Sequence, residues 1–347
     1  MASYNGRTSL ERLPLVTLFL SERCNSRCVS CDYWRHGRVD LDLEAVNRLL
    51  PSLERLGTEV VLISGGEPLL NPEWQQIAAV LGQQGLKVWL LTSGLSLAKH
   101  ASRASMLFDA ITVSLDGTDS GTYAAIRGVD AFDVVCRGVR AAVGANAVVT
   151  LRVTVQRGNF RQLPGFVELA RELGVAQVSF LAVDVANSHA FKRHEDFAAD
   201  LALRAEDLPE LQRILVGLER DHAEDFRTGF IAENPEKLRR QLLAYFTAVC
   251  GLGRFPPVRC NAPEFSAVID ARRHVSPCFF IGGPHQAVVT DDLGSALDGE
   301  DMIALRASIR RGERAECSRC VCSIWRDPGH VAAADRELLP MRRGARQ

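Results

Sequence analysis

The chain has almost no net charge and no long apolar segment. Its 347 residues include 41 basic and 42 acidic side chains, so no overall electric field would concentrate nucleic acid or an anionic membrane at its surface. No stretch approaches the roughly 20 consecutive apolar residues that span a bilayer, and residues 1–14 lack the apolar core of a signal peptide. We therefore expect a cytoplasmic protein with no nucleic-acid partner and no membrane partner.

Cysteine is the unusual component of an otherwise ordinary globular composition. The chain has 47% hydrophobic and 24% charged residues, and it contains ten cysteines. In a reducing compartment, metal or cluster binding is a better explanation for cysteines than disulfide bonds. The positions of the cysteines therefore indicate where to look for chemistry.

Short apolar runs alternate with longer amphipathic segments from residue 13 to residue 183, a pattern typical of βα units around a parallel sheet. Six strands are expected, at residues 15–20, 60–64, 87–92, 110–115, 148–155 and 177–183. Helices are expected between them, for example at 43–56 and 160–173. Six units are too few for a closed eight-stranded barrel. The predicted fold class is therefore α/β, a partial (β/α)6 TIM-like barrel with its chemistry at the C-terminal strand ends.

The pattern changes after this barrel, which we place at residues 13–183. Charged sequence with a helical period predicts a helical connector at residues 184–255. Residues 256–328 contain five cysteines and are expected to form a C-terminal auxiliary domain. Residues 329–347 contain Arg342, Arg343 and Arg346 near their end and are expected to be a basic tail.

Three cysteines follow the first predicted strand, in the order Cys24, Cys28 and Cys31. A structural zinc site would normally have four protein ligands, but this segment offers three thiols and no histidine at a suitable fourth spacing. On a [4Fe–4S] cluster held by thiolates, three ligands leave one iron open to bind a substrate or cofactor. The sequence therefore predicts a metal site here, with zinc or redox-active thiols as alternatives to the cluster.

The second predicted strand ends in Gly65, Gly66, Glu67 and Pro68. The two glycines allow the backbone to approach a ligand closely, and the carboxylate can accept a hydrogen bond from an ammonium group. Together with the CxxxCxxC spacing, this turn resembles the defining motifs of the radical S-adenosylmethionine (radical SAM) superfamily. The resemblance implies that the open iron binds the methionine moiety of S-adenosylmethionine (SAM), and that Gly65, Gly66 and Glu67 contact the same cofactor.

Weaker similarities follow on the next three predicted strands. The family places polar groups against the cofactor at the ends of the third and fourth strands, which implies contacts from Ser93, Ser114 and Asp116. Ordinary polar turns would also explain these residues. Arg152, inside the fifth predicted strand, could reach the cofactor carboxylate as a charged donor. The alternative for Arg152 is an outward-facing arginine.

A second group of cysteines lies in the C-terminal third. Cys317 and Cys320 form a CxxC pair, of the kind that holds zinc or iron–sulfur clusters. A hairpin expected over residues 269–280 would bring Cys278 back to Cys260, so the two pairs together imply one four-thiolate site. Cys322 is the candidate most able to replace a member of this set.

The second group resembles the twitch domain, a shortened SPASM domain that carries an auxiliary cluster in many radical SAM enzymes. In that pattern a glycine stands in the hairpin, but here the position is occupied by Arg273. The turn therefore needs another residue with positive φ, or a different geometry. The resemblance implies one auxiliary [4Fe–4S] cluster rather than two, with zinc as the alternative.

These resemblances imply a radical SAM enzyme with a [4Fe–4S] cluster that binds SAM and a second, auxiliary cluster in electron transfer. Such an enzyme cleaves SAM reductively to methionine and a 5′-deoxyadenosyl radical, which abstracts a hydrogen atom from a substrate. We expect oxidoreductase chemistry, namely oxidation, dehydrogenation or rearrangement of a small biosynthetic molecule, with a flavodoxin or ferredoxin as electron donor. A peptide-modifying (RiPP) maturase of the SPASM type is the first alternative, and a non-catalytic iron–sulfur or zinc protein is the second. The sequence identifies no catalytic side chain.

Overall fold

The computed structural model describes residues 10–185, 187, 189–191, 198–281, 287–289 and 292–326. The basic tail expected at residues 329–347 lies outside these ranges. No helix within them is long and apolar enough to cross a membrane.

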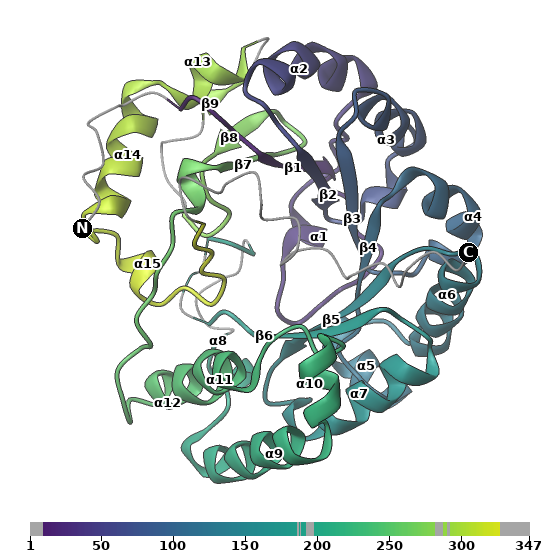
Figure 1. Ribbon diagram of the computed structural model, residues 1–347, viewed down its shortest axis with the longest axis vertical. Helices are drawn as coiled ribbons and strands as arrows, with labels where there is room; N and C mark the ends of the chain where they lie inside the picture. The colour runs from purple at the N-terminus through teal and green to yellow at the C-terminus, as the bar shows by residue number, and fades with distance from the viewer. Residues whose placement is uncertain are drawn as a thin grey trace.

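One open sheet organises the described part of the chain, with the strand order β6-β5-β4-β3-β2-β1-β7-β8-β9 (Figure 1). The first six strands are parallel throughout. They are β1 (Leu15–Ser21), β2 (Val60–Gly65), β3 (Lys87–Thr92), β4 (Ala110–Ser114), β5 (Val149–Val155) and β6 (Gln177–Ala182). Each strand lies within one residue of its expected bounds. The predicted partial barrel is therefore confirmed.

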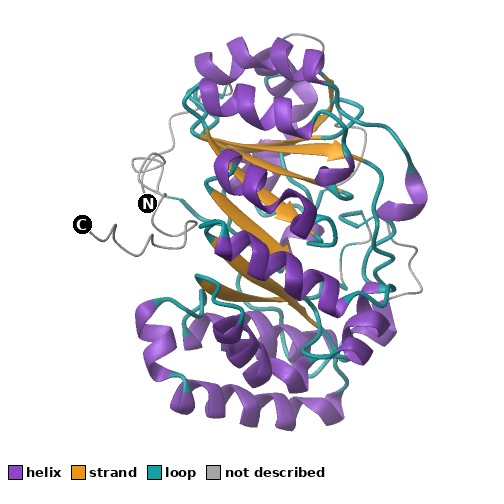
Figure 2. Cartoon of the chain, turned by 90° about the vertical axis from the view of Figure 1, so that its right-hand side faces the viewer, coloured by secondary structure: helices purple, strands orange, loops and turns teal. Residues whose placement is uncertain are grey.

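Helices connect these strands and pack on one side of the sheet, toward the viewer in Figure 2. They are α2 (Leu43–Arg55), α3 (Trp74–Gln83), α4 (Leu97–Leu107), α5 (Ser120–Arg127), α6 (Phe132–Gly144) and α7 (Leu163–Glu172). The short helix α1 (Tyr33–His36) lies instead inside the arc of strands (Figure 1), and two 3-10 turns, η1 (Pro68–Leu70) and η2 (Phe160–Gln162), precede α3 and α7. The start of α2 illustrates the local cause, since the side chain of Asp42 accepts a hydrogen bond from the backbone N–H of Ala45 (2.6 Å). Such a cap satisfies a donor that the helix itself cannot use.

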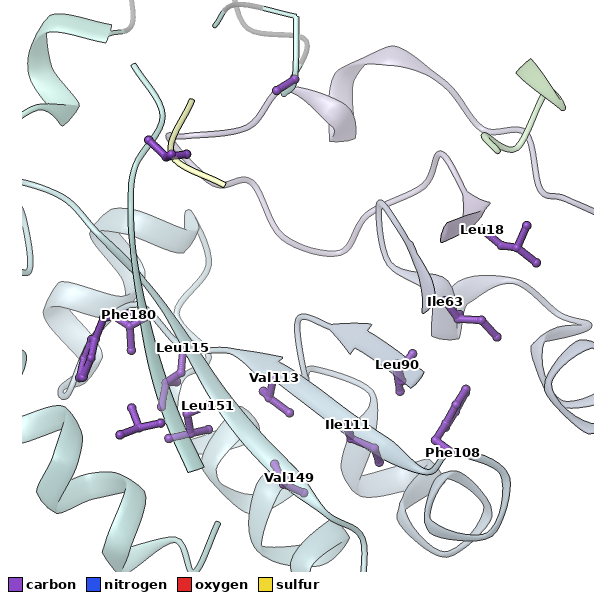
Figure 3. Packing of buried hydrophobic residues seen from close by; sticks show 14 of the residues in the cluster. Leu18, Ile63, Leu90, Phe108, Ile111, Val113, Leu115, Val149, Leu151 and Phe180 are labelled. Atoms are coloured by element: carbon purple, nitrogen blue, oxygen red, sulfur yellow. The ribbon is translucent and has the colours of Figure 1, made fainter. Parts of the chain in front are cut away.

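A row of aliphatic side chains crosses the sheet and forms the centre of the core. Leu18, Ile63, Leu90, Ile111 and Val149 stand next to one another in register on five successive strands. Each is fully buried, and Figure 3 shows them among the surrounding helices. Burying one such side chain stabilises the fold by roughly 1.5–3 kcal/mol. The row explains why the strand register, and with it the position of each strand end, is well defined.

The region after β6 is helical, as the charged sequence predicts. Its described helices are α8 (Ala198–Leu201), η4 (Ala205–Asp207), α9 (Leu208–Asp221), α10 (Ala223–Thr228), α11 (Pro235–Leu238), the π-helical turn η5 (Arg239–Ala244) and α12 (Tyr245–Val249). An isolated parallel bridge joins Val178 of β6 to Ile231. These helices therefore cover the β6 edge of the sheet.

The C-terminal cysteine region continues the barrel sheet. The turn η6 (Ala262–Glu264) leads to β7 (Ser266–Ile269), which pairs parallel with β1, while β8 (His274–Ser276) and β9 (Ala287–Val288) follow antiparallel. Helices α13 (Leu293–Leu297), α14 (Glu300–Arg310) and α15 (Ala315–Ser318) complete it. The expected hairpin forms, and Arg273 itself adopts a positive φ of 67° in its turn. An arginine thus takes the conformation for which glycine is usually chosen.

Candidate functional site

The three cysteines of the first group lie on the loop between β1 and α1, which we call the cysteine loop (residues 22–32). All three thiols are free and partly exposed. Burial raises the pKa of Cys24 to about 11 and that of Cys31 to about 12, and it also raises the pKa of Cys28. Neighbouring thiols add to the shifts of Cys24 and Cys31. Bringing three thiolates together here is therefore costly unless cations offset their charge, and bound iron would supply them.

The C-terminal end of α5 supports the cysteine loop. The backbone N–H of Arg27 donates to the carbonyl of Arg127 (2.9 Å), and that of Val29 donates to the carbonyl of Ile126 (3.0 Å). Gly128 ends the helix with a φ of +68°, and a Cβ atom there would lie 2.2 Å from the carbonyl oxygen of Arg27. Only glycine allows this contact, so the loop and α5 are fitted to each other.

The side chain of Arg127 places a buried positive charge beside Cys28. Its Nη1 lies 3.1 Å from Oδ2 of Asp116, whose other oxygen accepts a hydrogen bond from the backbone N–H of Thr154 (2.7 Å). Burial acts to lower the pKa of Arg127, but the negative charges of Cys28 and Asp116 outweigh it and raise that pKa. Burial raises the pKa of the Asp116 carboxyl, against the opposing effect of Arg127. We conclude that the guanidinium stays charged and faces the cysteine loop.

The sequence did not point to Arg127. A basic residue in the last turn of a helix, just before a glycine, is an ordinary helix end. The only available signal was its position 11 residues after Asp116, and that spacing has no meaning without the fold. Asp116 was expected to contact the cofactor, and in the structure both of its oxygens are engaged by Arg127 and Thr154.

Glu67 connects the ends of β2 and β3. It is completely buried, and its Oε1 accepts hydrogen bonds from the backbone N–H of Leu69 (3.1 Å) and the hydroxyl of Thr92 (2.8 Å). Its Oε2 accepts from the backbone N–H (2.7 Å) and the hydroxyl (2.6 Å) of Ser93. The Ser93 hydroxyl also lies 3.0 Å from Oδ1 of Asn25 in the cysteine loop. Three loops therefore converge on one carboxylate.

The two glycines before Glu67 face the chain itself. A Cβ atom at Gly65 would lie 2.7 Å from the carbonyl oxygen of Ser21, and one at Gly66 would lie 2.3 Å from that of Arg23. The backbone N–H groups of Gly66 and Glu67 donate to these same carbonyls, at 2.8 and 2.7 Å. The sequence indicated that the backbone at these glycines approaches another group closely, and in the structure that group is the backbone at the beginning of the cysteine loop.

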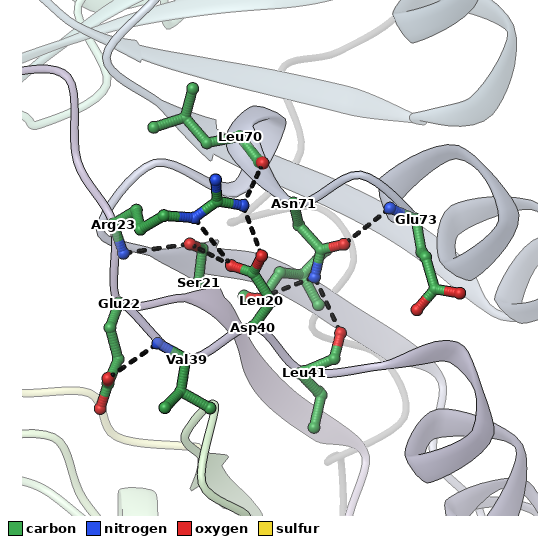
Figure 4. A network of polar contacts seen from close by, with 10 residues as sticks. All are labelled: Leu20, Ser21, Glu22, Arg23, Val39, Asp40, Leu41, Leu70, Asn71 and Glu73. Carbon is green, nitrogen blue, oxygen red and sulfur yellow. Dashed lines mark hydrogen bonds and ion pairs between the residues drawn. The ribbon is translucent and has the colours of Figure 1, made fainter. Parts of the chain in front are cut away.

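A polar network holds that beginning in place (Figure 4). The guanidinium of Arg23 pairs with Asp40 and donates to the carbonyl of Leu70 (2.6 Å). Asp40 also accepts from the hydroxyl of Ser21 (2.6 Å). The side-chain amide of Asn71 donates to the carbonyls of Leu20 and Leu41, both at 2.8 Å. The loop therefore leaves β1 in a direction set by side chains from β1, η1 and the segment before α2.

Ser114, the last residue of β4, pairs with Arg152 in the middle of β5. Both are partly buried, and Nε of Arg152 is enclosed with no hydrogen-bond partner. Burial raises the pKa of Cys322, and the charge of Arg152 acts to lower it. Arg152 therefore faces the C-terminal cysteines, and is not an outward-facing strand arginine.

The C-terminal cysteines gather in one place. Burial raises the pKa of Cys278 to about 12, and Cys260, Cys322 and Cys317 raise it further. Burial also raises the pKa of Cys320, together with Cys322, Cys278 and Cys260. All five predicted thiols are therefore close enough to interact electrostatically. Backbone N–H groups lie 3.4 Å from the sulfurs of Cys278 and Cys320, contacts that favour thiolates.

Among the described residues, no three thiol, imidazole or carboxylate side chains converge as they would around a single metal ion. The thiolates of a [4Fe–4S] cluster bind different irons, so they lie farther apart than the ligands of one ion. The two remaining cysteines lie elsewhere. Cys136 is buried in the core, and the thiol of Cys250 donates to the carbonyl of Leu203 (3.3 Å).

The two cysteine groups are connected by a cluster of five aromatic rings. Phe19 of β1 packs against Tyr33 (5.8 Å between centroids) and against Phe279 (5.7 Å), and Phe279 contacts Phe191 (5.2 Å) and Phe280 (5.3 Å). Tyr33 follows the last cysteine of the cysteine loop, and Phe279 directly follows a cysteine of the second group. The two candidate sites therefore belong to one continuous region of the molecule.

Comparisons with known proteins agree with this arrangement. Residues 18–175 match the radical SAM superfamily. Fe-coproporphyrin III synthase from Methanosarcina barkeri is 28% identical over 209 residues, which is 58% of this chain and 51% of that protein. A probable GTP 3′,8-cyclase from Saccharolobus solfataricus is 30% identical over 188 residues, 52% of this chain and 61% of that protein. The chain thus spans between half and two thirds of these curated relatives.

Solved structures share the fold at low sequence identity. SuiB of Streptococcus suis bound to SAM has a TM-score of 0.64 at 14% identity, covering 95% of this chain and 76% of SuiB. The enzyme anSMEcpe with bound SAM has a TM-score of 0.64 at 17% identity, covering 89% of each chain. The fold of nearly the whole chain is therefore found in proteins that bind SAM.

Proposed function

We propose that the chain, whose residues 18–175 match the radical SAM superfamily, is an enzyme that cleaves SAM reductively and abstracts a hydrogen atom from a small biosynthetic molecule. Members of the superfamily are enzymes that bind a [4Fe–4S] cluster and SAM. A cluster held by Cys24, Cys28 and Cys31 would supply the electron for reductive cleavage of the sulfonium bond of SAM, which yields methionine and a 5′-deoxyadenosyl radical. The observation that carries the proposal is the cysteine loop, which has three thiols on a backbone fixed by α5 and a buried arginine beside them.

The side chains around the loop have separable roles in this proposal. Cys24, Cys28 and Cys31 hold the cluster, and Arg127 offsets part of its negative charge. Glu67 fixes the geometry of the loops, because its two oxygens already accept four hydrogen bonds. A bond from the methionine ammonium would be added to these four or replace one of them.

The remaining cofactor contacts are proposed from their positions at the strand ends. Gly65 and Gly66 lie beside the cysteine loop, and Ser93 bonds to a residue of that loop. Ser114 and Arg152 lie on neighbouring strands at the same edge of the sheet. Asp116 would act on the cofactor directly or through its arginine partner.

The second group of thiols is proposed to hold an auxiliary [4Fe–4S] cluster. Cys260, Cys278, Cys317 and Cys320 are the ligand set, and Cys322 is close enough to replace one of them. An auxiliary cluster with four thiolate ligands would exchange electrons with a substrate radical, which supports oxidation or dehydrogenation as the outcome.

A peptide substrate is the second candidate. SuiB has been solved with its precursor peptide SuiA, at 14% identity, and anSMEcpe with a peptide, at 18% identity. The curated relatives, at 28% and 30% identity, are instead named for small molecules, a porphyrin and a nucleotide. The sequence relatives therefore favour the small molecule.

Iron and sulfide analysis with EPR of anaerobically reconstituted protein tests the proposal. The wild type should bind about eight irons, and the Cys24/Cys28/Cys31→Ala variant about four. SAM cleavage under reducing conditions should be lost in that variant. Cys136→Ala, which removes a thiol from the core, is the matched control and should change neither value. Wild-type SAM cleavage that survives in the triple variant would overturn the proposal, and a total of about four irons falling to none would remove the auxiliary cluster from it.

A further inference from the structure

The hairpin that carries Cys278 also contacts the cysteine loop. Its turn, at residues 270–273, joins β7 to β8, and Cys278 follows shortly after β8 ends. Nε of Arg272 in this turn lies 2.7 Å from Oε1 of Glu22, and its Nη2 lies 3.1 Å from Oε2. Glu22 is the first residue of the cysteine loop. One hairpin therefore reaches both cysteine groups, the first through its turn and the second through its end.

Glu22 closes the base of the segment that contains the first three cysteines. Its backbone N–H donates to the carbonyl of Val39 (2.9 Å), and its Oε2 accepts from the backbone N–H of Val39 (3.1 Å). A Cβ atom at Gly37 would lie 1.8 Å from the same oxygen, so the backbone there packs against the carboxylate. A shift of this carboxylate would therefore disturb both ends of the segment from residue 22 to residue 39.

Side-chain contacts within the turn hold the backbone of Arg272 in place. Oδ1 of Asp270 accepts hydrogen bonds from the backbone N–H groups of Arg272 (2.8 Å) and His274 (2.9 Å). Its Oδ2 lies 3.0 Å from Nδ1 of His274. Arg273 keeps a positive φ of 67° in this turn, and such conformations persist where the surrounding structure requires them, often at functional sites. The turn therefore presents Arg272 to Glu22 from a fixed backbone.

The two side chains of the ion pair differ in their exposure. The side chain of Glu22 is 8% exposed, and that of Arg272 is 50% exposed. Removing the guanidinium leaves no cavity in the core, but it takes from an enclosed carboxylate the cation that binds both of its oxygens. A substitution of Arg272 is therefore a local perturbation of the cysteine loop.

We propose that Arg272 is a positioning residue that couples the auxiliary cysteine site to the cysteine loop. The inference rests on the proposed function, because it takes a cluster to be bound at each site. A cluster bound by Cys278 fixes the end of the hairpin, and Arg272 transmits that constraint to Glu22. The cysteine loop therefore holds its own cluster more firmly when the auxiliary site is occupied. A purely structural ion pair would support the loop equally in both states.

Loss of iron from the anaerobically reconstituted protein to a ferrous chelator tests the coupling. In the proposed function SAM binds the cluster on the cysteine loop, so the EPR signal that changes when SAM is added reports that cluster. We expect this signal to decay about fivefold faster in Arg272→Ala, the effect of a half-exposed ion pair. It should also decay faster in Cys278→Ala/Cys317→Ala, which lacks two auxiliary ligands. Combining the substitutions should give no further increase.

Arg140→Ala is the matched control, because Arg140 also forms an exposed ion pair, with Glu172 on the barrel. This variant should leave the decay rate unchanged, and Arg272→Lys, which keeps the charge, should recover most of the wild-type rate. If Arg272→Ala accelerates the decay by the same factor with and without the auxiliary ligands, the ion pair is structural only and the coupling is refuted. A wild-type rate in Arg272→Ala refutes it as well.

Hydrogen exchange of the metal-free protein is a second readout that needs no cluster. The backbone N–H of Val39 should exchange faster in Arg272→Ala than in Arg140→Ala, because its acceptor is the carboxylate that Arg272 binds. Equal exchange in the two variants would overturn the role of Arg272. Iron content separates the two proposals. A total of about four irons refutes the auxiliary cluster and the coupling with it, whereas about eight irons with additive rates refutes the coupling alone.

Discussion

Replacing Glu67 by alanine should cost more stability than almost any other single change of a polar residue in this chain. The carboxylate is completely buried, and it accepts hydrogen bonds from the backbone N–H groups of Leu69 and Ser93 and from two hydroxyls. In Glu67→Ala these donors lose their acceptor inside the protein.

The size of this loss in stability follows from the number of hydrogen-bond donors that have no other acceptor than Glu67. The hydroxyl of Ser93 can turn to Oδ1 of Asn25, whereas the second contact of the Thr92 hydroxyl is the backbone N–H of Gly94, which donates to it and cannot replace the carboxylate. The two backbone N–H groups cannot rotate, and each buried donor without a partner costs about 1–3 kcal/mol. We therefore expect a loss of about 3 kcal/mol or more in the free energy of unfolding. At a urea m-value of about 3 kcal/mol/M, the unfolding midpoint falls by about 1 M.

Urea unfolding of the metal-free protein, followed by circular dichroism, measures this loss without the cluster. Glu172→Ala is the control, because Glu172 is an exposed carboxylate paired with Arg140, and such pairs contribute below about 1 kcal/mol. Glu67→Gln keeps the shape and should fall between the two. If Glu67→Ala lowers the midpoint no more than the control, the carboxylate does not hold the three loops together.

Two further predictions concern the support of the cysteine loop and the response to acid. Gly128→Ala should reduce iron retention far more than Gly85→Ala. Both glycines have a positive φ, but of the two only Gly128 has a backbone atom where a Cβ atom would lie. Equal iron contents in the two variants would show that the contact between the cysteine loop and α5 is not needed. Burial raises the pKa of Asp225, yet hydrogen bonds from Arg171 and His222 outweigh it and leave that pKa below its usual value. The resulting stability is present above about pH 4, the unfolded pKa, and is lost as the pH falls through the lower folded pKa, so Arg171→Ala should flatten the acid limb of stability against pH. An acid limb unchanged in that variant would contradict the assignment.

The strands were predictable because each buries apolar side chains at a period that the sequence displays. All six barrel strands lie within one residue of expectation, since the row from Leu18 to Val149 leaves no other register that keeps these residues in the core. The pairing of β7 with β1 was not predictable. The two strands are separated by more than 240 residues, and no local pattern records a parallel contact at that distance.

The candidate site residues also divide into those that the sequence indicates and those that only the fold reveals. The chain order of Cys24, Cys28 and Cys31 predicts by itself a metal site, because three thiols within one loop favour metal or cluster binding. The charge beside them does not show in the sequence, since Arg127 reaches Cys28 only after α5 packs under the loop. The glycines before Glu67 were visible as a close approach, but the partner of that approach is the chain itself.

The sequence by itself therefore determined the helices and strands of the barrel and which cysteines lie together on one loop, because periodicity and loop spacing are properties of neighbouring residues. The tertiary structure alone decided which distant groups meet: Arg127 with Cys28, Arg152 with the C-terminal cysteines, and Arg240 with the pocket beside Cys320. Charges act through space over several ångströms. Their effect depends on where the fold places them and not on their distance along the chain.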